Sequence, residues 1–332
     1  MNVAMWGKAL RTIPRLSKEE WLSLDVIARW LVASRAAVLV MTATSAMIAG
    51  VWAWHDGMFN GLLWVCLFVG LTMAHAANNL INDLMDYRSG VDHNNYFRAQ
   101  YGPQPLVHGL LDQKGLLVYI AITGLIALVP GAYLVYLRGE LALYLLLAGA
   151  AFVIFYTWPL KYIGMGEVAV FVIWGPLMVG GGYYVITGQW SWDAVLISIP
   201  QTLAATTVLF GKHIDKSGAD RASKIYTLPV ILGPRLAKAV AVALIVGQYL
   251  VVGWLIARGT VTPVLGVVIL AATAGWAAIS VFGTERPEAP PADYPPDVWP
   301  LWYAPYAFVH TRLFGLLFFV GVIVDALWAQ FR

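Results

Sequence analysis

The sequence predicts an all-α, polytopic membrane protein, and three observations support this fold class. Of its 332 residues, 60% are hydrophobic and 12% are charged, which is too apolar a balance for a soluble domain. The apolar residues gather in runs of about 17 to 25, the length that an α-helix needs to span a bilayer. Basic residues are also distributed unequally between the segments that join these runs, as cytoplasmic and external segments are.

The apolar runs predict about nine transmembrane helices. In chain order they cover residues 36–54, 59–80, 116–137, 141–158, 168–186, 194–210, 236–257, 261–282 and 313–328. We therefore divide the chain into an N-terminal segment, 1–35, and a transmembrane domain, 36–332.

The basic residues predict the orientation. With the N-terminus on the cytoplasmic side, only Arg138, Arg258 and Arg332 of the 21 Lys and Arg residues fall outside, as the positive-inside rule requires. We expect a multi-pass protein of the cell (inner) membrane, with the lipid bilayer as a partner. Topology accounts for the basic residues, so the net charge of +3 gives no reason to expect nucleic acid as a partner.

The N-terminal segment is predicted to be cytoplasmic and to contain an amphipathic helix. Trp21, Leu24, Ile27 and Leu31 recur at helical spacing, which would place them on one side of a helix lying in the membrane interface. The segment mixes acids and bases and lacks a cleavable apolar core, so we expect no signal peptide.

Three loops are long enough to matter for function. Loops 86–115 and 212–235 each begin beside an aspartate cluster on the same predicted face, which favours two similar halves followed by a ninth helix, with a site where the halves meet. The third loop, 284–311, is rich in Pro and aromatic residues. We expect it to be an interfacial connector held by Trp and Tyr, with an active-site lid as the alternative.

The first aspartate cluster lies in "NNLINDLMDYRSGVD", residues 78–92. Asn79, Asn82, Asp83 and Asp86 recur at i, i+3, i+4 and i+7, so on a helix all four lie on one stripe. A carboxylate at the bilayer costs about 2.5 to 3.5 kcal/mol, and two like charges one turn apart repel each other. We therefore expect a positive partner between them.

The second cluster, "GKHIDKSGADRASK", spans residues 211–224 and supplies Asp215 and Asp220. Basic residues surround these acids: Lys212, Lys216, Arg221 and Lys224. Carboxylate and amide oxygens suit Mg²⁺, which usually keeps positions open for substrate phosphate. The two clusters together predict a metal–diphosphate site, with simple solvation of the second cluster as the alternative.

These residues resemble the UbiA superfamily of intramembrane prenyltransferases, helical proteins that join an allylic diphosphate to an acceptor. The first cluster most resembles the branch that prenylates 1,4-dihydroxy-2-naphthoate on the way to menaquinone, whose pattern is NDxxDYxxGxD. The matching positions are Asn82, Asp83, Asp86, Tyr87, Gly90 and Asp92. "FVIWGPLMVGGGYYVITG" (171–188) and "KIYTLPVILG" (224–233) resemble further segments of that branch. The resemblance implies a UbiA-like helical bundle with a cytoplasm-facing active site.

The second cluster departs from the pattern NNxRDxxxD of these relatives. Gly211 and Lys212 replace the two asparagines, and five residues separate Asp215 from Asp220. On an unbroken helix this spacing turns the two acids about 140° apart. The segment must therefore leave helical geometry if both are to face one metal, and Gly218 could allow this.

The resemblance implies a polyprenyl diphosphate-dependent prenyltransferase that acts on an aromatic, quinone-precursor acceptor. Mg²⁺ and basic side chains would neutralise the leaving diphosphate, so that no protein nucleophile is needed. The implied catalytic residues are Asp83, Asp86, Asp215 and Asp220. The implied metal ligands are the same four aspartates and Asn82. The implied substrate-binding residues are Asn79, Asn82, Arg88, Tyr156, Lys161, Lys212, Lys216 and Lys224.

Two other functions stay open at this point. The same fold could cyclise the allylic diphosphate without an acceptor, or the acids could serve a non-enzymatic cation transporter. Transport is less expected because transport sites usually lie near mid-membrane. His75 is expected to pack between helices, with proton acceptance as the alternative, and for His213 both roles are open.

Overall fold

The computed structural model describes residues 2–14, 16–90, 104–295 and 298–330, and every regular element in these ranges is a helix. Eight helices of this described part are long and apolar enough to cross a membrane. They are η1–α4 (Ala36–His55), α5 (Gly61–Arg88), α7 (Gln113–Arg138), α9–η3–α10 (Gly166–Thr187), α11 (Trp192–Asp215), α13 (Leu228–Ala257), η4–α14 (Pro263–Phe282) and α15 (Tyr303–Ala329).

One further apolar helix, α8 (Glu140–Phe155), has 16 residues. At 1.5 Å per residue it is about 24 Å long, shorter than the hydrocarbon core of about 30 Å. The structure confirms the all-α membrane fold, while the count of nine spans depends on α8 and stays a prediction.

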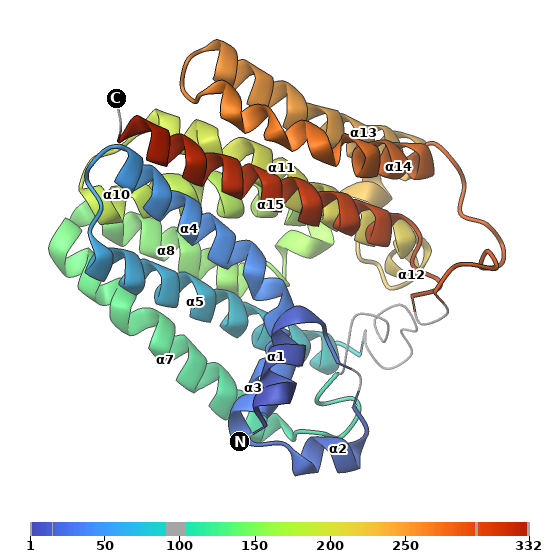
Figure 1. Cartoon of the computed structure of the whole chain (residues 1–332). Coiled ribbons are helices and arrows are strands. Elements are labelled where there is room, and N and C mark those ends of the chain that lie inside the picture. Colours follow the sequence, from blue (N-terminus) through green and yellow to red (C-terminus); the bar gives the residue numbers. More distant parts are fainter. Residues whose placement is uncertain (1, 15, 91–103, 296–297, 331–332) are drawn as a thin grey trace.

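The helices form a closed bundle (Figure 1). α4 packs on α5, α5 on α7, and α7 on α8; α11 packs on α13 and α15. α15 also packs against α4, so the last and first spanning helices are neighbours. Every consecutive pair of long helices thus shares a packed face. The interior space of the bundle is bordered by α4, α5, α8, η3 (Ile173–Gly180) and α11.

Glycines allow the closest helix approaches within this bundle. A Cβ at Gly182 of α10 (Gly181–Thr187) would lie 2.8 Å from Leu67 Cδ2, and one at Gly180 would lie 2.6 Å from Val195 Cγ2. A side chain at either position would displace its neighbour, so Gly182 allows the close contact of α10 with α5 and Gly180 allows that of η3 with α11.

The N-terminal segment does not form the single amphipathic helix that the sequence predicts. It forms α1 (Val3–Arg11), α2 (Lys18–Ser23) and α3 (Val26–Ala33). Asp25 separates the last two because its side chain accepts a hydrogen bond from Ala28 N at 2.9 Å and caps α3. Trp21 is buried against protein, whereas Ile27 is 45% exposed, so the predicted apolar side is split.

The aromatic, Pro-rich loop is shorter than predicted. α14 (Ala272–Phe282) precedes it and α15 begins at Tyr303, ten residues before the last predicted run. The described part of the connector is therefore 283–295 and 298–302, and the final residues of the predicted loop belong to a membrane helix.

The predicted orientation can be tested by labelling single cysteines in a Cys66→Ala background. Ser89 after α5 and Ser223 after α12 (Ser217–Ala222) are exposed at one end of the bundle, and Gln189 is exposed at the other. We expect a membrane-impermeant maleimide added to inverted vesicles to label the first two, and one added to intact cells to label Gln189→Cys. Labelling of Ser89→Cys and Ser223→Cys from opposite sides would contradict the orientation.

Candidate active site

The bundle encloses a chamber of about 970 Å³. Its polar lining comes from the ends of helices on one side of the bundle: Arg35, Asn79, Asn82, Asp86, Tyr156, Lys161, Lys212, His213, Lys216 and Arg312. Its apolar lining comes from the opposite halves of the same helices: Cys66, Leu67, Gly70, Leu134, Leu145, Gly182 and Val185. The chamber therefore has one charged end and a long apolar remainder.

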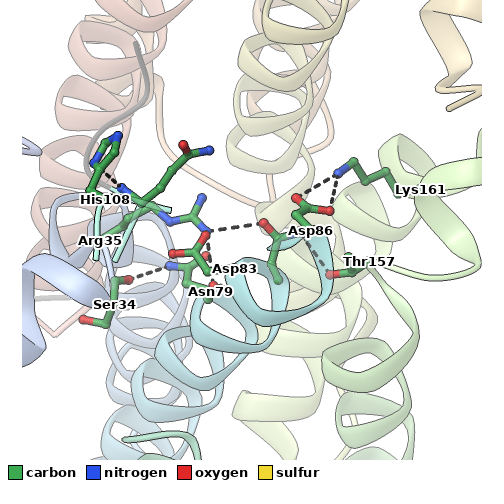
Figure 2. Close-up of polar contacts among 10 residues, drawn as sticks. Ser34, Arg35, Asn79, Asp83, Asp86, His108, Thr157 and Lys161 are labelled. Atoms are coloured by element: carbon green, nitrogen blue, oxygen red, sulfur yellow. Dashed lines mark hydrogen bonds and ion pairs between the residues drawn. The ribbon is translucent and has the colours of Figure 1, made fainter. Parts of the chain in front are cut away.

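Asp83 is bound by an arginine that the sequence analysis used only for orientation. Arg35 Nη2 lies 2.5 Å from Asp83 Oδ1, and both side chains are at most 10% exposed. The same nitrogen donates to Asn79 O at 3.1 Å and to Asn82 Oδ1 at 3.3 Å. Arg35 takes a left-handed backbone conformation, φ 54°, directly before η1 (Ala36–Leu39), which brings it to the stripe on α5 (Figure 2).

Asp86 is bound by a lysine from the other side of the chamber. Lys161 Nζ, in the turn η2 (Leu160–Ile163) after α8, lies 3.2 Å from both carboxylate oxygens. Asn82, on the same face of α5 as Asp86, donates from Nδ2 to Thr157 Oγ1 at 3.1 Å. Figure 2 shows Arg35 and Lys161 reaching α5 from opposite sides, so the expected positive partner is present as two separate residues.

The second cluster leaves helical geometry at Lys216 and not at Gly218, the position at which the sequence analysis expected a break. α11 ends at Asp215, Lys216 has φ −109° and ψ 13°, and α12 starts at Ser217. The turn brings Asp220 Oδ1 to 3.0 Å from Lys216 Nζ, with both side chains buried. Asp220 Oδ2 has no hydrogen-bond partner among the described residues.

The two clusters meet at the charged end of the chamber. Burial lowers the pKa of Lys216, Asp220 and Asp86 oppose this shift, and the positive charge of Lys161 adds to it. Lys216, Asp86 and Lys161 all line the chamber, so residues from both clusters share its charged end.

Asp215 points away from this meeting point and caps α15. Its carboxylate accepts hydrogen bonds from Trp302 N, Tyr303 N and Ala304 N at 2.9, 3.0 and 2.9 Å. A Cβ at residue 211 would lie 3.0 Å from Ala304 N. Gly211, which departs from the resembled motif, is thus required by the contact between α11 and the first turn of α15.

The structure brings together only part of the predicted site. Asn79, Asn82, Asp86, Tyr156 and the three lysines 161, 212 and 216 line the chamber. Asp83 and Asp220 lie behind this wall, each bound to a basic residue. No three His, Cys, Asp or Glu side chains of the described residues form a group that could hold a metal, so the predicted cluster of four aspartates is not assembled. Asp92 lies outside the described residues.

Two predicted substrate-binding residues are not at the chamber. Arg88 is exposed and its Nε donates to Gln113 Oε1 at 3.2 Å, because it lies two residues, about 200°, around the helix from Asp86. Lys224 is exposed in a left-handed turn, φ 57°, after α12. Their part in substrate binding stays a prediction that the chamber does not support.

The sequence analysis missed a buried acid beside the chamber. Glu167 is in α9 (Gly166–Val172). Its Oε1 lies 2.5 Å from His213 Nδ1, and its Oε2 accepts a hydrogen bond from Leu228 N at 3.3 Å. The sequence does carry a signal for this pair. Glu167 stands directly before an apolar run, and a charge in such a position needs a buried partner. His213 is therefore held in place by an element distant in sequence.

The charged end of the chamber suits an anionic head group, and its long apolar part suits a hydrocarbon tail. The fold and site therefore define the class: an intramembrane protein with a chamber suited to such an amphiphile. Residues 42–294 match the UbiA prenyltransferase family. The chain belongs to this family, as its motifs indicate.

Similar proteins share either sequence or fold with this chain. It is 26% identical over 223 residues to UbiA prenyltransferase domain-containing protein 1 of Gallus gallus, covering 63% of each protein. It is 27% identical over 221 residues to 2-carboxy-1,4-naphthoquinone phytyltransferase of Synechocystis sp., covering 65% of this chain and 68% of that protein. The chain thus spans less than two thirds of the length of the Gallus gallus relative.

Two solved structures have the same fold. The apo UbiA homologue of Aeropyrum pernix has a TM-score of 0.65 at 17% identity, covering 86% of this chain and 98% of that chain. A UbiA homologue of Archaeoglobus fulgidus, bound to GPP and Mg²⁺, has a TM-score of 0.58 at 15% identity, covering 89% and 99%.

The cap at α15 predicts graded effects of substitutions at Asp215. Both of its carboxylate oxygens accept backbone hydrogen bonds, so Asp215→Asn keeps one acceptor and turns an NH2 donor toward the remaining backbone N–H, whereas Asp215→Ala removes both acceptors. Because a side-chain cap is worth about 0.5 to 2 kcal/mol, we expect Asp215→Asn to unfold below the wild-type temperature in detergent and Asp215→Ala to unfold lower still. An Asp215→Asn variant that unfolds at the wild-type temperature but loses turnover would show instead that Asp215 binds metal, because an amide is a weaker metal ligand than a carboxylate.

Proposed function

We propose that this protein is a membrane prenyltransferase that moves a polyprenyl group from an allylic diphosphate to an aromatic, quinone-precursor acceptor. The observation that carries the proposal is the chamber, whose charged end lies beside a long apolar wall. The names of two relatives support the substrate classes: one solved homologue is bound to GPP and Mg²⁺, and one curated relative is a naphthoquinone phytyltransferase.

The donor atoms at the charged end suit Mg²⁺. Asp86 and Asn82 present oxygen ligands to the chamber, Asp83 lies beside them, and Asp220 Oδ2 is buried without a hydrogen-bond partner among the described residues. Mg²⁺ is usually held by one or two carboxylates with substrate phosphates completing the shell, so a complete protein cage is not needed. When bound, Mg²⁺ would neutralise charge that develops on the leaving diphosphate.

The basic residues have two roles in this proposal. Lys161, Lys212 and Lys216 line the charged end and bind the diphosphate oxygens. Lys161 neutralises Asp86 in the structure and turns to the diphosphate when substrate binds. Arg35 acts differently, because its contacts with Asn79, Asn82 and Asp83 fix the orientation of the stripe; it is a positioning residue.

The apolar wall has the complementary role. It holds the prenyl chain by burial and excludes the water that would quench an allylic cation. The aromatic rings of Tyr156 and Trp174 also line the chamber, and a ring face near the cation stabilises it by cation–π attraction.

Removing the carboxylate of Asp86 should stop turnover while the fold is kept. We expect Asp86→Asn to lower the rate about 10²- to 10³-fold, the effect of losing one preorganised electrostatic group, and excess EDTA to abolish wild-type activity until Mg²⁺ is restored. Product formation is measured by mass spectrometry in detergent. The control is Asp193→Asn. Asp193 lies in the first turn of α11, at the end of that helix far from Lys212 and Lys216, and is 45% exposed, so this variant should keep the wild-type rate. Full activity of the wild type in excess EDTA would refute the metal role.

Transfer and cyclisation can be separated by their products. Both need the diphosphate ionised, but only transfer needs a second substrate. We expect geranylgeranyl or longer diphosphate with Mg²⁺ to release little hydrocarbon alone, and to give a prenylated product when 1,4-dihydroxy-2-naphthoate is added. A cyclic terpene formed without acceptor, at a rate that the acceptor does not change, would identify a cyclase instead.

A further inference from the structure

Two chamber residues, His75 and Trp174, are not among the basic residues proposed to bind diphosphate. His75 precedes Asn79 by one helical turn on α5, about 6 Å further from the charged end, and Trp174 faces the chamber from η3. Their rings are 5.3 Å apart and inclined by 78°. η3 is a π-helical segment, a geometry that is frequent at functional sites.

A chain of hydrogen bonds fixes the tautomer of His75. Trp174 Nε1 donates to Thr42 Oγ1 at 3.1 Å, and Thr42 Oγ1 lies 2.8 Å from His75 Nδ1. An indole N–H can only donate, so the Thr42 oxygen accepts from Trp174. Thr42 is fully buried, and a buried hydroxyl hydrogen needs an acceptor. That acceptor is Nδ1, the remaining contact of this hydroxyl among the described residues.

Since Nδ1 accepts, the neutral imidazole carries its hydrogen on Nε2. This N–H is on the far side of the ring from Thr42, and the residue lines the chamber. His75 makes no other hydrogen bond with the described residues. A donor facing an apolar space is unfavourable unless an oxygen meets it, so the fold holds a hydrogen-bond donor ready for a ligand.

A neighbouring side chain adds an acceptor about 4.5 Å nearer the charged end, because three residues of α5 separate it from His75. Asn78 Nδ2 donates to Val153 O at 3.0 Å, which leaves its Oδ1 to accept, and Asn78 also lines the chamber. Residues 75 and 78 are three apart on α5 and so lie on one face. The backbone of Trp174 is also held, because Ser45 Oγ donates to Trp174 O at 2.8 Å, while its ring is held through Nε1 by Thr42.

We infer that His75, Asn78 and Trp174 form the subsite for the aromatic acceptor. His75 Nε2–H binds an oxygen substituent of a planar ring, Asn78 Oδ1 accepts from a ring hydroxyl, and the indole packs against the ring. The acceptor then lies between the charged end and the apolar wall. This subsite rests on the proposed function, and it assigns His75 to acceptor specificity, with no proton transfer.

Direct binding tests this without turnover. Labelled 1,4-dihydroxy-2-naphthoate is titrated onto the full-length protein in nanodiscs, with Mg²⁺ and an unreactive thiolodiphosphate analogue. A hydrogen bond to a charged or polar oxygen is lost in His75→Phe, and we expect about tenfold to hundredfold weaker binding. Thr42→Val removes the group that fixes the tautomer and should weaken binding less, whereas Thr42→Ser should bind as the wild type does.

The controls distinguish this subsite from general damage. His55→Phe changes a histidine that stacks on Trp52 at the other end of α4 and should not alter binding. In turnover assays His75→Phe should raise the KM for the naphthoate while the KM for the prenyl diphosphate stays within about twofold of wild type.

Each outcome decides one of the two claims. Equal binding by wild type and His75→Phe, no binding by wild type, or a raised KM for the prenyl diphosphate alone would overturn the subsite. Naphthoate binding that depends on His75, in a protein that transfers no prenyl group, would uphold the subsite and refute the proposed function.

Discussion

The site depends on the need to pair every charge that is buried in an apolar bundle. Three ion pairs meet this need: Arg35–Asp83, Lys161–Asp86 and Lys216–Asp220. Each pair joins an acid to a base, and two of them join elements far apart in sequence. Buried ion pairs stabilise a fold weakly, because desolvation offsets most of the attraction. The function proposed above gives these carboxylates and lysines a second role, because they suit a metal and a diphosphate.

The cap formed by Asp215 links the second cluster to the wall of the chamber. Three backbone amides at the start of α15 donate to this carboxylate, and Gly211 permits the close contact. The first turns of α15 then supply Ala304, Pro305 and Phe308 to the chamber lining. One acid that the motif suggested as a metal ligand therefore shapes the space beside the site, and Lys212 and Lys216 on either side of it face that space.

The chamber has two regions, one suited to the anionic head group of an amphiphile and one suited to its hydrocarbon chain. Its charged residues come from the segment before η1, the ends of α5 and α11, the turn after α8, and α15, and its apolar residues lie farther from that end. Between these two regions lie His75, Asn78 and Trp174, whose polar atoms are ordered by Thr42 and Val153. Depth along α5 thus separates the charged, polar and apolar parts of the chamber lining.

Local information in the sequence determined the membrane fold and the stripe on α5, because hydropathy and a period of 3.6 residues act within single helices. The spacing also showed that an unbroken helix would turn Asp215 and Asp220 to different sides; the chain does leave the helix between them, but Asp215 faces α15 and not Asp220. Only the tertiary structure decided the partners. Arg35 reaches Asp83 across 48 positions and Lys161 reaches Asp86 across 75, and Asp215 caps a helix that starts 88 positions later at Tyr303. Such contacts are set by how helices pack around one another, and no periodicity within a segment records them.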